Sequence, residues 1–228
     1  MALALHYHPL SSYCWKVLIA LHEKGLPFEA KTVDLGDAAG RTAFEALWPT
    51  AKIPLLQDGE RFVPETAIQI EHLDLNHGGP RMLPGDPAAQ LDVRLWDRLF
   101  DNYVMSPLQQ AVGHHLRPEG QRDPLALDDA ASRLTMAYAM IEARMPGATW
   151  AVGESFTLAD CAAAPSLFYA SIFLPFPSAH PRLSAYFERL IARPSVARVI
   201  ADARPYLQYF PLADRVPPRF LAAADDAG

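Results

Sequence analysis

The amino-acid sequence predicts an α/β domain joined to an all-α domain. Over residues 1–80, segments with strand-type alternation follow segments with helix-type periodicity in the order β-α-β-α-β-β-α. From residue 88 onward, apolar residues recur only at helical spacing, and the stretch between is broken by Pro-Gly and Gly-Pro pairs. We therefore expect a domain over residues 1–80, a linker over 81–87 and a helical domain over 88–228.

The elements of the first domain follow one another closely. Leu3, Leu5 and Tyr7 alternate with other residue types, which is typical of a half-buried strand. Residues 13–24 carry apolar side chains at helical spacing, and Gly25 then predicts the end of that helix. Asp58-Gly59 is a strong hairpin signal. The other expected elements are a strand over 28–33, a helix over 41–47, strands over 53–57 and 61–63, and a helix over 65–76.

The second domain is expected to be built from helices alone. A long helical pattern covers residues 88–116, and Pro107 predicts a kink or break near Ser106 because proline has no backbone N–H to donate. The tail from Pro205 contains several prolines, so we expect it to run extended over the surface. The remaining expected helices cover residues 125–145, 158–173 and 181–193, with a short one from residue 194.

Charge and composition exclude several classes of partner. The chain has 228 residues and a net charge of −6, which argues against a nucleic-acid partner, since phosphate binding needs a concentrated basic surface. The first ten residues lack the pattern of a signal peptide, and no stretch approaches the roughly 20 apolar residues of a membrane span. The two cysteines, Cys14 and Cys161, do not suggest a disulfide scaffold. We expect a cytoplasmic protein without a membrane partner.

The junction between the first strand and the first helix carries the first chemical motif, Pro9-Leu10-Ser11-Ser12-Tyr13-Cys14-Trp15. Free N–H groups at a helix N-terminus stabilise anions, and a serine hydroxyl there can also donate to a thiolate. Alternatively, Ser11 or Ser12 only caps the helix. The spacing of Ser11 and Cys14 resembles a redox C-x-x-C motif with its first cysteine replaced, although we expect Cys14 to be packed rather than reactive.

Two further motifs favour a peptide-like ligand. In Lys52-Ile53-Pro54, a cis bond before Pro54 would turn the Ile53 backbone toward a ligand that pairs like an extra strand. At Glu65-Thr66 a strand runs directly into a helix, so a ligand carboxylate could bind the first-turn N–H groups and the Thr66 hydroxyl. Glu65 would then face the ligand's ammonium group, or alternatively it only favours the helix dipole.

The order and spacing of Ser11, Ile53-Pro54 and Glu65-Thr66 resemble the cytosolic glutathione S-transferases. The predicted capping box that begins at Thr157 and ends at Asp160, which Phe156 would staple against Cys161, also resembles one in that family. The resemblance implies a thioredoxin-like first domain, glutathione as co-substrate and a homodimer. It implies a detoxification enzyme that activates the glutathione thiol for attack on a small hydrophobic electrophile between the domains.

Residue roles follow from the same resemblance. Residues 11–17 look like the S-S-C-S-W-R-V stretch of zeta-class enzymes and the S-x-P-C stretch of the theta class, which makes Ser11 the catalytic hydroxyl. Tyr7 is the alternative, because it resembles the activating tyrosine of other classes, and Ser12 is a third choice. The implied glutathione-binding residues are Ser12, Lys52, Ile53, Pro54, Glu65 and Thr66, and the implied substrate-pocket residues are Tyr103, His114 and Phe168.

Other activities on the same fold remain open. They are a non-catalytic interaction or stress protein, a glutathione-dependent isomerase or peroxidase, and a thiol–disulfide oxidoreductase that uses Cys14. We expect no metal, because His6 with His8 and His114 with His115 lack the i, i+4 spacing of many helical metal ligands.

Overall fold

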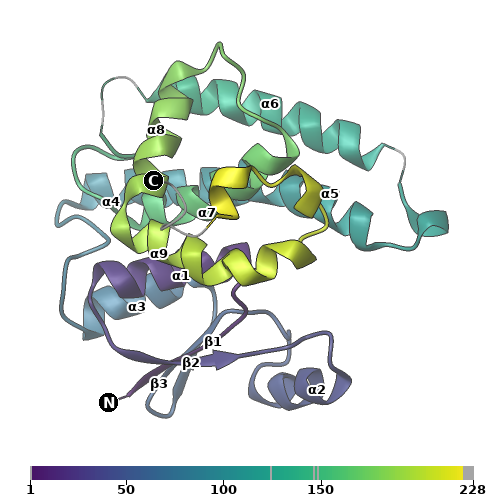
Figure 1. The fold of residues 1–228 in the computed structure, drawn as a ribbon. Helices are drawn as coiled ribbons and strands as arrows, with labels where there is room; N and C mark the ends of the chain where they lie inside the picture. The colour runs from purple at the N-terminus through teal and green to yellow at the C-terminus, as the bar shows by residue number, and fades with distance from the viewer. Residues whose placement is uncertain (1, 124, 146, 148, 223–228) are drawn as a thin grey trace.

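In the computed structural model, which describes residues 2–123, 125–145, 147 and 149–222, a four-stranded sheet forms the base of the molecule (Figure 1). Its strands are β1 (Leu3–Tyr7), β2 (Phe28–Thr32), β3 (Leu55–Asp58) and β4 (Arg61–Val63), in the spatial order β2-β1-β3-β4. Strand β1 pairs in parallel with β2 and antiparallel with β3, so that Leu5 lies between Ala30 and Leu56. Leu5 and Leu56 are fully buried, which explains this register.

Three helices belong to this sheet. They are α1 (Ser12–Glu23), α2 (Ala38–Leu47) and α3 (Thr66–Asn76), which confirms the predicted order β-α-β-α-β-β-α. Helices α1 and α3 lie between the sheet and the remaining helices (Figure 1). Helix α1 is buried on most sides, with Trp15, Val17 and Ile19 fully buried, because it packs against both layers.

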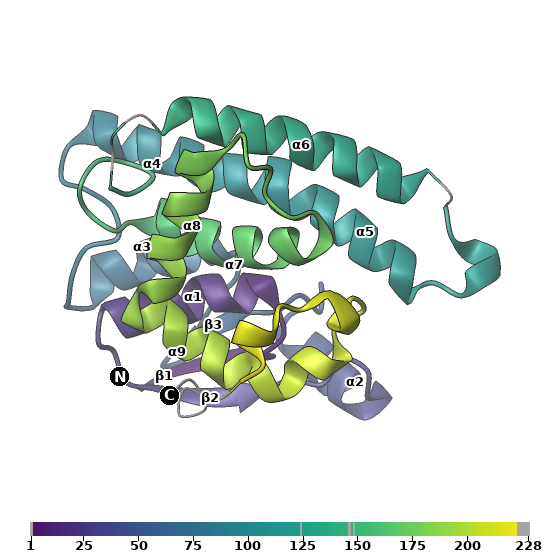
Figure 2. The same cartoon turned by 45° about the horizontal axis from the view of Figure 1, so that its top comes forward.

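The rest of the described chain is helical, as predicted. Helices α4 (Pro87–Leu99) and α5 (Ser106–Leu116) follow one another end to end, and α6 (Ala126–Arg144) runs alongside them (Figure 2). Helix α7 (Leu158–Phe173) passes through the centre of this part, and its residues are almost all buried. Helices α8 (Pro181–Ala192) and α9 (Pro194–Ala203) complete it, with α9 packed on α1. Among the described residues, no helix combines the length and the apolar character needed to cross a membrane.

The predicted break near Ser106 takes a different form. Helix α4 continues into a π-helical segment, Phe100–Met105, and then directly into α5. The Ser106 N–H donates to the Asp101 carbonyl five residues earlier, and the Ser106 hydroxyl donates to the same carbonyl at 3.1 Å. The wider turn accommodates Pro107 without ending the helix, and such π segments are frequent at functional sites.

The tail is not extended, contrary to the prediction. It folds into short 3-10 segments over Arg204–Tyr209, Ala213–Arg215 and Pro218–Phe220. The physical reason is an apolar residue every few positions: Leu207, Phe210, Leu212, Val216 and Phe220 are all buried. Their burial outweighs the preference of the prolines for an extended chain.

The core is continuous between the sheet-containing part and the helical part. The Trp15 ring lies 4.8 Å from that of Phe168 and 5.1 Å from that of Tyr169, and the Tyr169 hydroxyl donates to the Leu10 carbonyl at 2.9 Å. The start of α1, where the first motif lies, is therefore held by contacts with α7.

Candidate functional site

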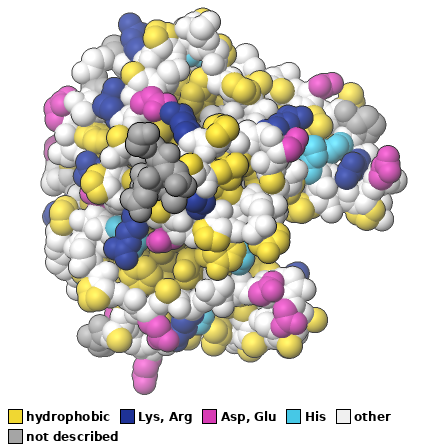
Figure 3. Space-filling view, in the orientation of Figure 1, with side chains coloured by type: hydrophobic (Ala, Val, Ile, Leu, Met, Phe, Trp, Pro, Cys, Tyr) yellow, Lys and Arg dark blue, Asp and Glu magenta, His cyan; other side chains and the backbone are white. Residues whose placement is uncertain are grey.

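A cleft of about 550 Å³ lies between the sheet-containing part and the helical part. Its first wall contains five of the residues predicted to bind glutathione: Lys52, Ile53, Pro54, Glu65 and Thr66. The opposite wall comes from α4, the π-helical segment and α5, and it consists of Arg98, Asp101, Asn102 and Gln109. The surface is visibly hollowed between the regions of α2 and α5 (Figure 3).

The start of α3 presents its first turn to this cleft. Thr66 is the first residue of α3 and is 9% exposed, while Glu65 before it is exposed and has φ 64°. The first N–H groups of a helix have no partners within the helix, so they are free to bind an anion. A non-glycine residue at positive φ costs of order 1–3 kcal/mol and persists mostly at functional sites. The other described non-glycine residue with positive φ, Ala51, lines the same cleft.

The loop before β3 forms the neighbouring wall. The peptide bond between Ile53 and Pro54 is cis, the form that the sequence motif suggested as one explanation. The Pro54 carbonyl accepts a hydrogen bond of 2.8 Å from the buried Gln69 side chain, which ties this loop to α3. Both predicted ligand-binding segments are therefore held in one unit.

A four-membered ion network lies behind the opposite wall. The Lys16 ammonium, which is almost fully buried, bonds to Asp97 and, at 3.0 Å, to Asp101. The Arg98 guanidinium donates to Asp97 at 2.9 Å and to Asp101 at 2.5 Å. Burial raises the pKa of Asp101, and its ion pair with Lys16 opposes that shift. Because each carboxylate meets both cations, the network places the half-exposed Arg98 at the cleft without leaving an isolated buried charge.

The two serines before α1 have different surroundings. Ser11 is the half-buried N-cap of α1, and its hydroxyl oxygen accepts a 3.4 Å hydrogen bond from the Cys14 N–H. Ser12 is buried, and its hydroxyl donates to the Met105 sulfur at 3.2 Å. Neither is among the lining residues of the cleft, whereas Tyr13 is. Burial raises the pKa of Tyr13 to about 12, so its hydroxyl keeps its proton at neutral pH.

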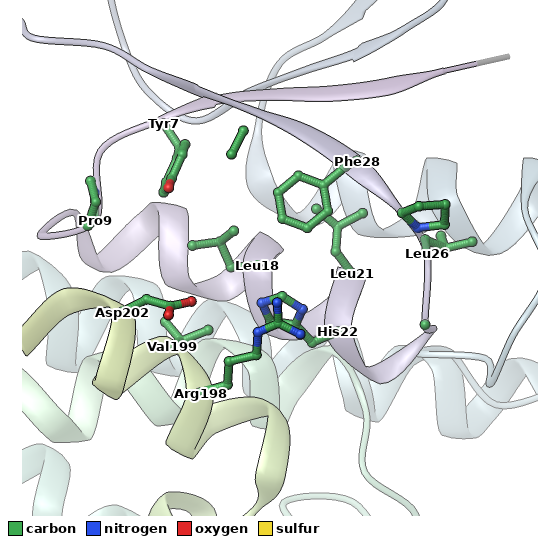
Figure 4. A pocket seen from close by; sticks show the side chains of 13 residues that line it. Tyr7, Pro9, Leu18, Leu21, His22, Leu26, Phe28, Arg198, Val199 and Asp202 are labelled. Atoms are coloured by element: carbon green, nitrogen blue, oxygen red, sulfur yellow. The ribbon is translucent and has the colours of Figure 1, made fainter. Parts of the chain in front are cut away.

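Tyr7 lies in a different cavity, of about 500 Å³ (Figure 4). There it faces Leu18 on α1 together with Val199 and Asp202 on α9. This cavity shares no lining residue with the cleft. Burial and the nearby Asp202 raise the pKa of Tyr7.

The residues expected to contact the electrophile are not among those that line the cleft. Tyr103 is 43% exposed, and the half-buried His114 ring lies 5.4 Å from that of His115. Phe168 is fully buried between Trp15 and Phe220, so its side chain belongs to the core. Its assignment to a substrate pocket is not supported by this position.

Sequence reasoning missed all four residues of the second wall. Arg98 and Asp101 are three residues apart on one helix, a spacing that favours an ion pair and could have drawn attention to them. Asn102 and Gln109 carry no such signal. Their place at the cleft depends on how the helical part packs against the sheet.

Two family models match the chain. The N-terminal domain of glutathione S-transferase matches residues 5–81, and the C-terminal domain of glutathione S-transferase matches residues 104–194. A glutathione S-transferase from Pseudomonas putida is 29% identical over 206 residues, which cover 88% of this chain and 92% of that protein. FtsZ-localized protein A from Caulobacter vibrioides is 29% identical over 213 residues, which cover 89% and 92%.

A solved structure of a protein from the same family also resembles this chain. The glutathione S-transferase from Methylobacterium radiotolerans, in complex with glutathione sulfonate, superposes with a TM-score of 0.76 at 32% identity. The match covers 87% of this chain and 94% of that one.

Proposed function

The chain belongs to the glutathione S-transferase family, and from that membership we propose that it binds glutathione in the cleft and transfers its sulfur to a small hydrophobic electrophile. One observation carries the proposal. Lys52, Ile53, Pro54, Glu65 and Thr66 come from separate segments of the sequence, yet they line a single cleft. The electrophile would enter from the side of the helical part.

We propose one direction for the ligand in the cleft, in which its charged groups meet residues of opposite charge or free N–H groups. The γ-glutamyl carboxylate would bind the first-turn N–H groups of α3 and the Thr66 hydroxyl, while its ammonium group faces Glu65. The cysteinyl backbone would pair with the Ile53 backbone, and the glycine carboxylate would meet the exposed Lys52. This orientation directs the sulfur toward the start of α1.

Thiol activation needs no metal or general base in this scheme. An ordinary thiol has a pKa of about 8.5, and lowering it by ~2 units requires about 2.7 kcal/mol. A hydroxyl hydrogen bond to a charged group contributes roughly 1.5–3 kcal/mol. The N-terminus of α1 contributes up to ~2 kcal/mol in favourable geometry. Together the Ser11 hydroxyl and this helix end are sufficient.

Calorimetric titration with glutathione tests the binding site. Thr66→Ala should weaken binding by roughly 1–3 kcal/mol, because the variant loses a hydroxyl bond to a charged carboxylate. Glu65→Gln should weaken it as well, since the ligand's ammonium group loses its counter-charge. Thr135→Ala is the matched control, because that exposed hydroxyl donates to its own helix at Ala131. Unchanged affinity in both cleft variants would rule out this site.

A non-catalytic interaction protein is the second candidate. It is favoured by the similarity to a protein named for its localization with FtsZ and not for a transferase activity. A panel of aryl halides, hydroperoxides and double-bond isomers separates the two. Glutathione binding without turnover of any of them would favour the interaction protein.

We extend the proposal to a homodimer with a detoxification role in the cytoplasm, as is usual in this family. The dimer is supported by exposed apolar residues on α3 and α4: Ile68 is 54% exposed, Leu91 67% and Leu95 46%. Glu71 on α3 forms a two-bond ion pair with Arg94 on α4, at 2.9 and 2.8 Å. This pair holds the two helices together, so the apolar residues beside it form one patch, which we call the α3–α4 patch.

A further inference from the structure

A cluster of two histidines and one aspartate joins the end of α3 to the sheet. Asp58 is the last residue of β3, His72 lies on α3, and His77 is the residue at which the chain leaves α3. The His72 and His77 Nε2 atoms lie 2.9 and 2.8 Å from the same oxygen, Asp58 Oδ2. One donor atom from each residue lies within 4.8 Å of the other two.

The donor set has the composition of a transition-metal site. Imidazole nitrogen and carboxylate oxygen are ligands of Zn²⁺, with bonds of about 2.0–2.2 Å and tetrahedral geometry. Such bonds separate neighbouring ligand atoms by about 3.3 Å. The present separations from Asp58 Oδ2 are shorter by roughly half an ångström. Small side-chain rotations would therefore open enough space for a cation, which would take the place of the hydrogen-bonding protons between Asp58 and the two histidines.

An unpartnered oxygen gives independent support. The Asp58 side chain is only 10% exposed, and its Oδ1 has no hydrogen-bond partner among the described residues. A buried carboxylate oxygen without a partner carries an energetic cost. A cation held by both oxygens of Asp58 would remove that cost.

Asn76 lies beside the outer ring nitrogen of His72. Its side-chain amide lies 3.1 Å from His72 Nδ1. Metal binding through Nε2 leaves the proton of the neutral imidazole on Nδ1, where it needs an acceptor. The Asn76 amide nitrogen also donates to the His72 carbonyl at 2.9 Å, which fixes its orientation, so the acceptor for that proton would be water.

From this arrangement we propose that Asp58, His72 and His77 bind a divalent cation of the zinc type, with a fourth position left for water. The site lies at the opposite end of α3 from Thr66. Over the length of α3 (Thr66–Asn76), that separation is about 15 Å at the helical rise per residue. The cation would clamp the end of α3 to β3 and would not take part in the chemistry of the cleft. The two histidines are five positions apart, and His77 lies outside the regular helix, so the i, i+4 pattern does not find them.

Calorimetry with Zn²⁺ on untagged protein, treated with a chelator and free of glutathione, tests the site. We expect one Zn²⁺ per chain and no comparable binding of Mg²⁺, which prefers oxygen ligands. His77→Ala and Asp58→Asn should each weaken Zn²⁺ binding by more than about 100-fold, beyond the effect of losing an outer contact. His115→Ala is the matched control. It removes a histidine from the His114–His115 pair, which lies outside the proposed site, and should leave Zn²⁺ binding unchanged.

Thermal unfolding separates loss of the site from loss of the fold. Saturating Zn²⁺ should raise the midpoint of the parent and of His115→Ala, and a chelator should reverse the rise. Saturating Zn²⁺ should leave the unfolding midpoint of a folded His77→Ala variant unchanged. Absence of Zn²⁺ binding by the parent, or binding that survives in His77→Ala and disappears in His115→Ala, would overturn the proposal. Neither result bears on glutathione binding, which is measured without metal.

Discussion

Four hydroxyl groups lie near the start of α1, and among them that of Tyr13 belongs to a residue that lines the cleft. The other three, which the sequence suggests for thiol activation, differ in what they can reach. The Tyr7 hydroxyl lies in the cavity beside α9, and the Ser12 hydroxyl is buried against Met105. The Ser11 hydroxyl caps α1, so it lies at the positive end of that helix. It accepts one hydrogen bond there and keeps its proton available as a donor. These positions favour Ser11 over Tyr7 and Ser12 as the group that stabilises a thiolate.

We therefore predict that Ser11→Ala raises the pKa of bound glutathione by roughly 1–2 units, the equivalent of one hydrogen bond to a charged group. The thiolate is the reactive form, so turnover should fall most near neutral pH and recover as the pH rises through the new pKa. Glutathione affinity should change little. Thiolate absorbance of the bound ligand, followed against pH, measures the shift.

Tyr7→Phe is the control for this experiment. It should titrate like the parent, because its hydroxyl faces the other cavity. If Ser11→Ala titrates like the parent while Tyr7→Phe shifts upward, tyrosine is the activating residue. Ser11→Ala also removes a helix cap, so its stability should be measured and is expected to fall by about 0.5–2 kcal/mol.

The position of Cys14 in the core predicts that its thiol is unreactive toward thiol reagents. It is fully buried, and burial raises the pKa of its thiol to about 12. At pH 8 only about one molecule in 10⁴ would carry the thiolate. We predict that the folded protein reacts very slowly with thiol reagents, whereas the unfolded chain exposes both Cys14 and Cys161. Rapid labelling of one thiol in the folded state would instead support the thiol–disulfide oxidoreductase alternative.

At the scale of elements, the start of α7 has the strongest local determinant. The predicted capping box is confirmed: Asp160 accepts from the Thr157 N–H at 2.8 Å and from its hydroxyl at 3.0 Å. The same carboxylate also accepts from the Ala151 N–H at 2.9 Å and from the Tyr186 hydroxyl at 2.6 Å. Asp160 thus joins the start of α7 to α8 and to the preceding loop.

We predict that Asp160→Ala destabilises the protein by at least about 3 kcal/mol, because it leaves several buried donors unpaired. Asp86→Ala is the matched control, since Asp86 caps α4 through one exposed bond, of 2.8 Å, from the Ala89 N–H. That loss should be about 1 kcal/mol. Denaturant unfolding followed by circular dichroism measures both. Equal losses would mean that the additional bonds to Asp160 contribute little.

The sequence predicts elements well where the determinants are local. The strand at Leu3–Tyr7, the hairpin at Asp58-Gly59 and the cap of α7 depend on neighbouring residues, and the structure contains all of them. The π-helical segment before Pro107 and the folded tail depend on distant partners, so local patterns did not reveal them. The cleft divides in the same way. Its first wall is formed by local motifs, whereas Arg98 and Gln109 reach it only through packing of the helical part.

For the whole molecule, the α3–α4 patch predicts association. Large exposed apolar residues gathered on one surface often mark an interface, and two-fold pairing is the commonest closed assembly. We predict a sedimentation mass near twice the 25.2 kDa of one chain at micromolar concentration. Leu91→Glu should shift the protein toward the single-chain mass, because a charge would be buried in the interface.

Leu116→Glu is the control for the dimer. Leu116 is 70% exposed but lies at the far end of α5, outside the α3–α4 patch. The Leu116→Glu variant should have the same sedimentation mass as the parent protein. A parent protein that sediments as a single chain would contradict the prediction outright.

The continuous core has a consequence for how the molecule responds to its ligand. Trp15, Phe168 and Phe220 pack in series, so the first helix, the central helix and the tail share one apolar interior. Parts that share an interior unfold together rather than one after the other. A ligand held mainly by the sheet-containing part therefore protects the distant tail as well, because any opening that exposes Phe220 also disturbs the helix beneath the cleft. Glutathione bound in the cleft would therefore raise the free energy of unfolding of the whole chain, and not only that of the sheet-containing part.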